Sequence, residues 1–183
     1  MNLVIHPEDA TTRMLEVLYE GTEYVLITDP LPRRAMRRLL RESPQQERIL
    51  LLGHGSAAGL LYREKQGTNE FSGLIISHGH AYPLRRHGAN LVGIWCNAVN
   101  FARRERLHGL FSGMLITELE EAREHNVATS QEELARENVN LAKKLRLLLE
   151  SDVPLRDIPA LMEELDTAKT ELTMFNYRNF FYV

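Results

Sequence analysis

Hydrophobic residues in the first half of the chain follow two alternating patterns. Four short runs are apolar at almost every position, and they occupy residues 2–5, 23–29, 48–52 and 90–95. Between the first three runs, apolar residues recur at helical spacing, with Met14, Leu15 and Leu18 in residues 11–20 and Ala35, Met36, Leu39 and Leu40 in residues 30–43. Strands without polar alternation, separated by amphipathic helices, are typical of a parallel sheet that is covered on both faces. The pattern predicts an α/β fold, a three-layer α/β/α sandwich with a mostly parallel central sheet.

The segment between the last two runs, residues 56–89, is rich in glycine and polar residues. It contains two shorter strand candidates, "GLLYRE" at 59–64 and "GLIIS" at 73–77. Two short strands joined by a polar, glycine-containing connection are typical of a hairpin. We expect this hairpin at the rim of the central sheet.

After residue 101 the pattern is mainly helical. We expect helices in residues 107–125, in residues 130–151 and in residues 158–169, the last capped by Asp157. In the second helix, Ser130 and Glu133 have capping-box spacing, and Leu134, Leu141, Leu145 and Leu148 form one apolar stripe. The aromatic end, residues 172–183, looks like a strand. It either packs as the final strand or joins two chains into a homodimer.

Composition places the chain among globular proteins. It has 183 residues, of which 44% are hydrophobic, and a formal net charge of −3. This size predicts a single domain over residues 1–183. There is no basic, then apolar, leader at the N-terminus and no apolar run long enough to span a membrane, so we expect a cytoplasmic protein. The negative net charge makes nucleic acid an unlikely partner overall and leaves any basic surface local.

Two residues that follow apolar runs are candidates for chemistry. Histidine precedes glycine four times, at His54, His78, His87 and His108, but only His54 follows an apolar run that is itself preceded by a full amphipathic helix. The single cysteine, Cys96, comes directly after the run at 90–95. Ligands of open α/β sheets bind at the carboxyl ends of the strands. If the two strands are neighbours, about 4.8 Å apart, both side chains reach one substrate atom.

The pair has the chemistry of a thiol hydrolase. An imidazole can accept the thiol proton and later protonate the leaving group. The N–H groups of Gly55 and Cys96 are candidates to hold a developing oxyanion. An active site of this kind predicts a thiol pKa below about 8.5 and rapid alkylation.

The two blocks "ILLLGHGS" and "NLVGIWCNA" resemble the histidine and cysteine blocks of the caspase-like cysteine peptidases, and are most similar to the CHAT-like branch. The resemblance covers residues 48–120 by motif. It implies a caspase-like fold, a peptide or protein substrate, Cys96 as nucleophile, His54 as general base and acid, Gly55 as oxyanion donor, and no cofactor. The family has a small residue before the cysteine, whereas this chain has Trp95. The alternative is a catalytically inactive binding or regulatory module with the same fold.

Two other clusters suggest different sites. His78, His80 and His87 lie close in sequence, but residues 73–90 contain no carboxylate to support a metal, so we expect exposed loop histidines and no metal site. Residues 33–41 carry five arginines, a pattern found in phosphate and RNA sites. Without an aromatic residue among them for base stacking, a solvated helix face is the simpler interpretation.

Overall fold

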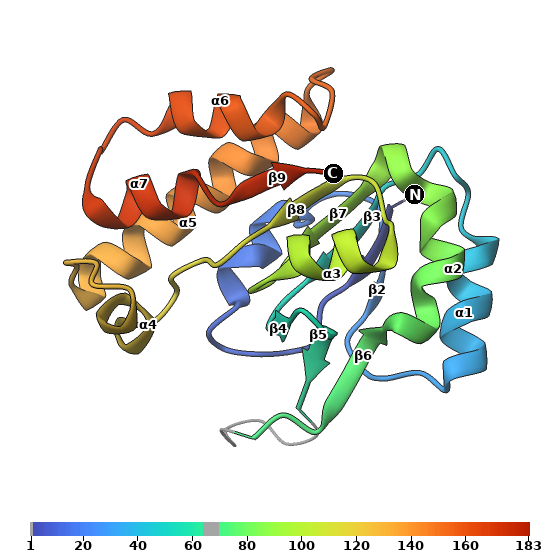
Figure 1. Cartoon of the computed structure of the whole chain (residues 1–183). Helices are drawn as coiled ribbons and strands as arrows, with labels where there is room; N and C mark the ends of the chain where they lie inside the picture. The colour runs from blue at the N-terminus through green and yellow to red at the C-terminus, as the bar shows by residue number, and fades with distance from the viewer. Residues whose placement is uncertain (1, 64–69) are drawn as a thin grey trace.

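A six-stranded sheet forms the centre of the computed structural model, which describes residues 2–63 and 70–183 (Figure 1). Its strands lie in the order β2-β1-β3-β7-β8-β9. They span β1 Asn2–Ile5, β2 Tyr24–Ile27, β3 Ile49–Leu52, β7 Leu91–Ile94, β8 Leu110–Ser112 and β9 Phe180–Tyr182. All neighbouring pairs are parallel except β8 and β9, which are antiparallel. The predicted α/β class and mostly parallel sheet are confirmed.

Helices cover both faces of this sheet. They are η1 Arg13–Leu18, α1 Arg33–Glu42, η2 His78–His80, α2 Ala81–Leu84, η3 Arg85–Asn90, α3 Ala98–Glu105, α4 Leu119–Glu124, α5 Gln131–Glu150, α6 Ile158–Leu165 and α7 Glu171–Tyr177. Successive residues of a strand point to opposite faces. In β3, Ile49 and Leu51 therefore pack with α1, α2 and α3, whereas Leu50 and Leu52 pack with η1, α5 and α6. The result is a three-layer arrangement.

The predicted hairpin forms a second, smaller sheet. Strands β4 (Gly55–Ser56), β5 (Gly59–Tyr62) and β6 (Gly73–Ser77) are antiparallel neighbours in that order. β5 lies within the strand expected at 59–64, and residue 64 lies outside the described residues. Since β4 follows β3 after only two residues, this sheet begins at the carboxyl edge of the central one (Figure 1).

Two segments of the second half, residues 107–125 and 172–183, have a secondary structure that differs from the expectation. Residues 110–112, expected within a helix, form the buried strand β8 between Gly109 and Gly113, and the helix that follows covers only Leu119–Glu124. Residues 171–177 form α7 instead of a strand, because the Thr170 hydroxyl accepts the Thr173 N–H and caps a helical turn. Only the last residues pair as β9, at the edge of the sheet. Self-association through β9 stays a prediction.

The long helix α5 agrees closely with its sequence pattern. It begins after Ser130, whose hydroxyl accepts the Glu133 N–H, and its leucine stripe packs onto the sheet through Leu141 and Leu145. Asp157 precedes α6 but makes no capping hydrogen bond. Within the described ranges, none of the helices has the length and apolar character that a membrane span requires.

Candidate functional site

His54 and Cys96 occupy equivalent positions at the carboxyl edge of the central sheet. Strands β3 and β7 are parallel neighbours, with Leu52 opposite Ile94. Each candidate side chain follows its strand by two residues. Gly53, with a φ of 136°, provides the turn that carries the chain from β3 to His54, and its N–H donates to the Ile94 carbonyl at 3.1 Å. The sequence left open whether these two strands are neighbours, and the structure shows that they are.

The two side chains line one small cavity. Its volume is about 20 Å³, and it is bordered by His54, Cys96, Trp95 and Leu115 among others. That volume holds a single water molecule. The Cys96 thiol donates to the carbonyl of Leu115, another residue that lines this cavity, at 3.8 Å.

The thiol of Cys96 is neutral in the resting protein. Burial raises its pKa to about 11, and the carboxylates of Glu121 and Glu118 add to the effect. The pKa of the Cys96 thiol therefore lies above the value of less than about 8.5 that the sequence analysis expects of an active site. The physical reason is that a thiolate in this partly buried position loses hydration and faces negative charges.

A chain of hydrogen bonds fixes the imidazole of His54. The Thr11 hydroxyl donates to Asp9 Oδ1 at 2.7 Å and lies 2.6 Å from His54 Nε2. A hydroxyl has one proton, which Thr11 uses toward Asp9, so its oxygen accepts and His54 Nε2 must donate. In the neutral imidazole the lone pair is then on Nδ1. The arrangement selects the tautomer whose Nδ1 can act as a base.

Asp9 is the last member of this hydrogen-bond chain, and its carboxyl stays ionised. Burial alone would raise the pKa of its carboxyl, but two hydrogen bonds from Thr11 and the charges of His54 and Arg63 more than offset this and hold it below its usual value. Arg63 lies 2.7 Å from Asp9 Oδ2, and its guanidinium also stacks over the ring of Phe71 at 4.3 Å. Phe71 in turn lies against the His54 ring, with 5.4 Å between centroids. The imidazole is thus held from two sides.

A second histidine lies behind the first. His6 is buried, with Nδ1 3.0 Å from the Tyr19 hydroxyl and Nε2 3.1 Å from the Thr12 hydroxyl. Burial lowers its pKa to about 4, against an opposing effect of Asp9. His6 is therefore neutral near pH 7 and adds no charge to the site.

Trp95, the departure from the family pattern, is built into the core. Its indole Nε1–H donates to the Ser56 carbonyl at 3.1 Å, and its ring packs against Phe101. A Cβ on Gly55 would lie 2.0 Å from the indole Cδ1. Residue 55 must therefore be glycine because the indole takes the space of a side chain. The turn after β3 is made by Gly53, whereas Gly55 lies in β4.

The histidines of the second cluster do not form a joint site. His78 is exposed and lies 2.7 Å from Glu105 Oε2, whereas His80 and His87 are buried. The Ser77 N–H donates to His80 Nδ1, and His87 Nε2 donates to the Leu40 carbonyl. The expectation of three exposed loop histidines is wrong for these two, because both satisfy backbone groups of packed elements. Across residues 2–63 and 70–183, no three or more His, Cys, Asp or Glu side chains are placed to hold a metal.

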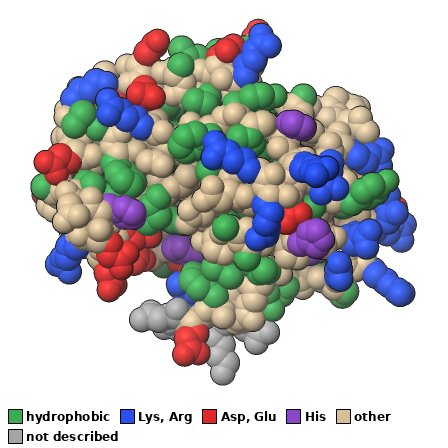
Figure 2. All heavy atoms as spheres, in the orientation of Figure 1, with side chains coloured by type: hydrophobic (Ala, Val, Ile, Leu, Met, Phe, Trp, Pro, Cys, Tyr) green, Lys and Arg blue, Asp and Glu red, His purple; other side chains and the backbone are tan. Residues whose placement is uncertain are grey.

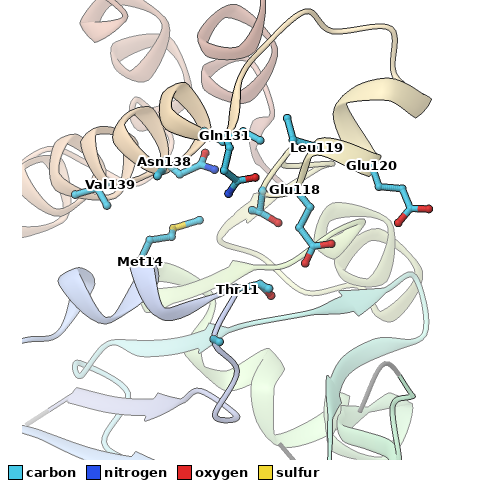
Figure 3. Close-up of a pocket in the computed structure, with 12 residues that line it drawn as sticks. Thr11, Met14, Glu118, Leu119, Glu120, Gln131, Asn138 and Val139 are labelled. Atoms are coloured by element: carbon cyan, nitrogen blue, oxygen red, sulfur yellow. The ribbon is translucent and has the colours of Figure 1, made fainter. Parts of the chain in front are cut away.

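A larger cavity opens beside the small one. It has a volume of about 610 Å³ and shares Met14 and Thr117 with the cavity of His54 and Cys96. Thr11 and Met14 form one wall, Gln131 and Asn138 of α5 a second, and the Glu118 carboxylate points inward (Figure 3). Its volume lies within the range of small-molecule binding sites in proteins.

Sequence reasoning missed Asp9, Thr11, Arg63 and Phe71. A signal was present for the first two, since "HPEDATT" directly follows the apolar run of β1 and so reaches the same sheet edge. Arg63 and Phe71 lie at the ends of the hairpin strands, and only the fold of that hairpin brings them over His54.

A scan against protein-family models finds no match, and searches of curated proteins and of solved structures return no similar chain. The case for a function therefore depends on the site itself.

Proposed function

We propose that this protein is a thiol hydrolase that cleaves a peptide bond, with Cys96 as nucleophile and His54 as general base and acid. The proposal includes the caspase-like assignment that the two sequence blocks suggest. The observation that carries it is the hydrogen-bond chain from Asp9 through Thr11 to His54, which leaves Nδ1 as the basic atom of an imidazole that lines one cavity with Cys96.

The reaction begins from neutral partners. As Sγ of Cys96 bonds to the substrate carbonyl carbon, its proton passes to His54 Nδ1 and the carbonyl electrons move to oxygen. The backbone N–H groups of Gly55 and Cys96 hold this oxyanion. When the C–N bond breaks, the amine leaves with the proton from His54. Water then attacks the thioester, gives a proton to His54, and Sγ departs as the thiol.

Each partner of His54 has a role in this scheme. The Nε2–H bond to Thr11 keeps the ring oriented, and Asp9 stabilises the imidazolium that forms after proton transfer, with Nε2 3.6 Å from Oδ1. The cavity that Cys96 and His54 line is too small for a substrate, since it holds only a water molecule. The substrate therefore approaches through the larger cavity beside it.

The test is a positional library of fluorogenic tetrapeptide amides that presents every amino acid at the cleaved position. We expect cleavage by the wild type, none by Cys96→Ala, and a loss of at least 100-fold in His54→Ala, the usual size of a general-base effect. His108→Ala is the control, since His108 also precedes a glycine but is exposed and lies outside the site. Library-wide absence of cleavage, or equal cleavage by Cys96→Ala, rejects the proposal.

Thr11 provides a sharper test of the proton route. Thr11→Val keeps the shape but removes the acceptor of the Nε2–H, whereas Thr11→Ser restores it. We expect a roughly tenfold lower kcat in the valine variant, because an unpaired buried donor costs about 1–3 kcal/mol, and recovery in the serine variant. Equal kcat in all three would show that Thr11 does not position His54.

A second candidate, a non-catalytic binding module, is favoured by one observation. The thiol is partly buried, and its pKa of about 11 is far from that of an activated nucleophile. In this case the larger cavity binds a peptide without turnover. Library peptides would then bind, as measured by calorimetry, with the same affinity in wild type and in Cys96→Ala, and none would be cleaved.

A further inference from the structure

A concentrated basic surface lies over α1 and α2, away from the His54 site. Figure 2 shows blue side chains gathered at the right side of the molecule, where Figure 1 places these two helices. Two cavities occur there, of about 220 Å³ and 40 Å³. The first is lined by Arg33, Arg37, Arg85, His78 and Tyr82 among others, and the second by Arg37, Arg41, Tyr82, Pro83 and Arg86.

The arginines of this surface are not neutralised by the protein. None of the five arginines that line the two cavities forms an ion pair with a carboxylate among the described residues. The nearest candidates, Glu42 and Glu105, pair instead with Arg38, Arg104 and His78. In a chain with a net charge of −3, five unpaired guanidinium groups at two adjoining cavities form a local positive field.

Backbone groups contact three of these side chains, and Nη1 of Arg86 donates to the Arg41 carbonyl at 3.5 Å. A Cβ on Gly79 would lie 2.5 Å from Nε of Arg33, so the guanidinium lies directly against the chain there. Nε of Arg85 donates to the Glu105 carbonyl at 2.8 Å. The pKa of buried His80 is lowered by burial and also by the charges of Arg33 and Arg37. The cavity is therefore lined by positive charge.

Tyr82 supplies the aromatic side chain that the sequence pattern of α1 lacks. It comes from α2, borders both cavities and is 70% exposed, more than any other large hydrophobic residue of the described chain. A flat ring exposed between two arginine-lined cavities has the layout of a single-strand binding surface, in which bases stack while phosphates bind cations. A duplex keeps its bases paired and offers none to Tyr82.

We propose that this surface binds single-stranded nucleic acid, with one phosphate at Arg33, Arg37 and Arg85, the next at Arg37, Arg41 and Arg86, and a base stacked on Tyr82. Arg33, Arg37 and Arg41 are one helical turn apart, about 6 Å along the axis, and an extended strand spans that step between phosphates. The site is independent of the proposed hydrolase.

The test measures fluorescence anisotropy of 12-nucleotide RNA and DNA labelled with fluorescein, from 50 to 300 mM salt. We expect binding that weakens with salt, and a log–log slope that decreases in magnitude by about 0.7 in Arg37→Gln, the contribution of one phosphate contact on a single strand. Arg34→Gln is the matched control, because Arg34 is on the same helix but lines neither cavity. Tyr82→Ala should weaken binding about tenfold with no change in slope, and Tyr82→Phe should preserve it.

Several results would overturn the proposal. One is the absence of binding of either oligonucleotide at 50 mM salt, and another is a loss of affinity in Arg34→Gln equal to that in Arg37→Gln. Unchanged affinity in Tyr82→Ala or tighter binding of a 12-base-pair duplex would also overturn it. So would polyglutamate that competes as strongly as unlabelled oligonucleotide, which would indicate an acidic protein partner instead. Comparison of the RNA and DNA arms decides which nucleic acid is preferred.

Discussion

The reactivity of Cys96 toward a small alkylating reagent is the most direct probe of the site's electrostatics. In the resting protein, burial raises the thiol pKa to about 11. Since the thiolate is the reacting species, the alkylation rate follows its fraction. We predict that the rate still rises about tenfold per pH unit between pH 7 and 9.

The magnitude follows from two opposing effects. At pH 7.5 a thiol of pKa about 11 is ionised to about 3 parts in 10,000, against about one part in ten for a free cysteine, a ratio of about 300. A more basic thiolate is also more nucleophilic, which recovers about tenfold. The N-terminus of α3, two residues after Cys96, favours the thiolate by up to about 1 kcal/mol, which is less than the shift from burial. We therefore expect alkylation roughly 10- to 30-fold slower than that of glutathione.

The assay is iodoacetamide labelling of the native protein, followed by intact-mass spectrometry at half-unit steps from pH 6 to 10. Glutathione and the protein unfolded in urea serve as references, and the unfolded protein should react as fast as glutathione. A plateau below pH 8 would refute the reasoning, because it would show a thiolate already paired with His54. In that case burial does not dominate the pKa, and the dyad is a preformed ion pair.

Three further predictions concern the stability of the same region. Gly55→Ala should lower the free energy of unfolding in urea by about 2–3 kcal/mol, because the added Cβ overlaps the Trp95 indole; an unchanged midpoint would contradict this packing. Ser112→Ala should cost about 1–3 kcal/mol, since the buried Ser112 hydroxyl accepts the Trp95 N–H at 2.9 Å and donates to its carbonyl at 2.8 Å; Ser151→Ala is an exposed control. The pKa of His6 is about 4 in the folded protein and about 6.5 in the unfolded chain. Between these two values the unfolded chain binds more protons than the folded protein, so the free energy of unfolding falls by about 3 kcal/mol as the pH drops from 6.5 to 4. His6→Gln should flatten that pH dependence, and an unchanged slope would assign it to other groups.

The sequence pattern predicted the central layer well because continuous apolar runs have few other uses. Strands β1, β2, β3 and β7 all lie within the expected runs. The pattern failed at β8, where only three residues form the strand. A three-residue run carries no period, and its burial depends on β7 pairing along one side and β9 along the other.

The candidate site was only half visible in the sequence. His54 and Cys96 follow from the rule for strand ends, and their equal register in β3 and β7 supports that rule. The tautomer of His54 depends on a hydrogen bond to Thr11, 43 residues away in the chain. The pKa of Cys96 likewise depends on burial and on the charges of Glu121 and Glu118, which no local pattern links to the cysteine.

The charges on either side of the proposed dyad bear on its starting state, in which the Cys96 thiol is neutral. Asp9 lies on the His54 side of the site, with Oδ1 3.6 Å from Nε2. Its negative charge is already compensated by Arg63 at 2.7 Å, and His6 behind it is neutral. On the other side, Glu118 and Glu121 oppose a thiolate. Burial and the two carboxylates therefore keep the proton on sulfur, which is the starting state of the hydrolase reaction that we propose.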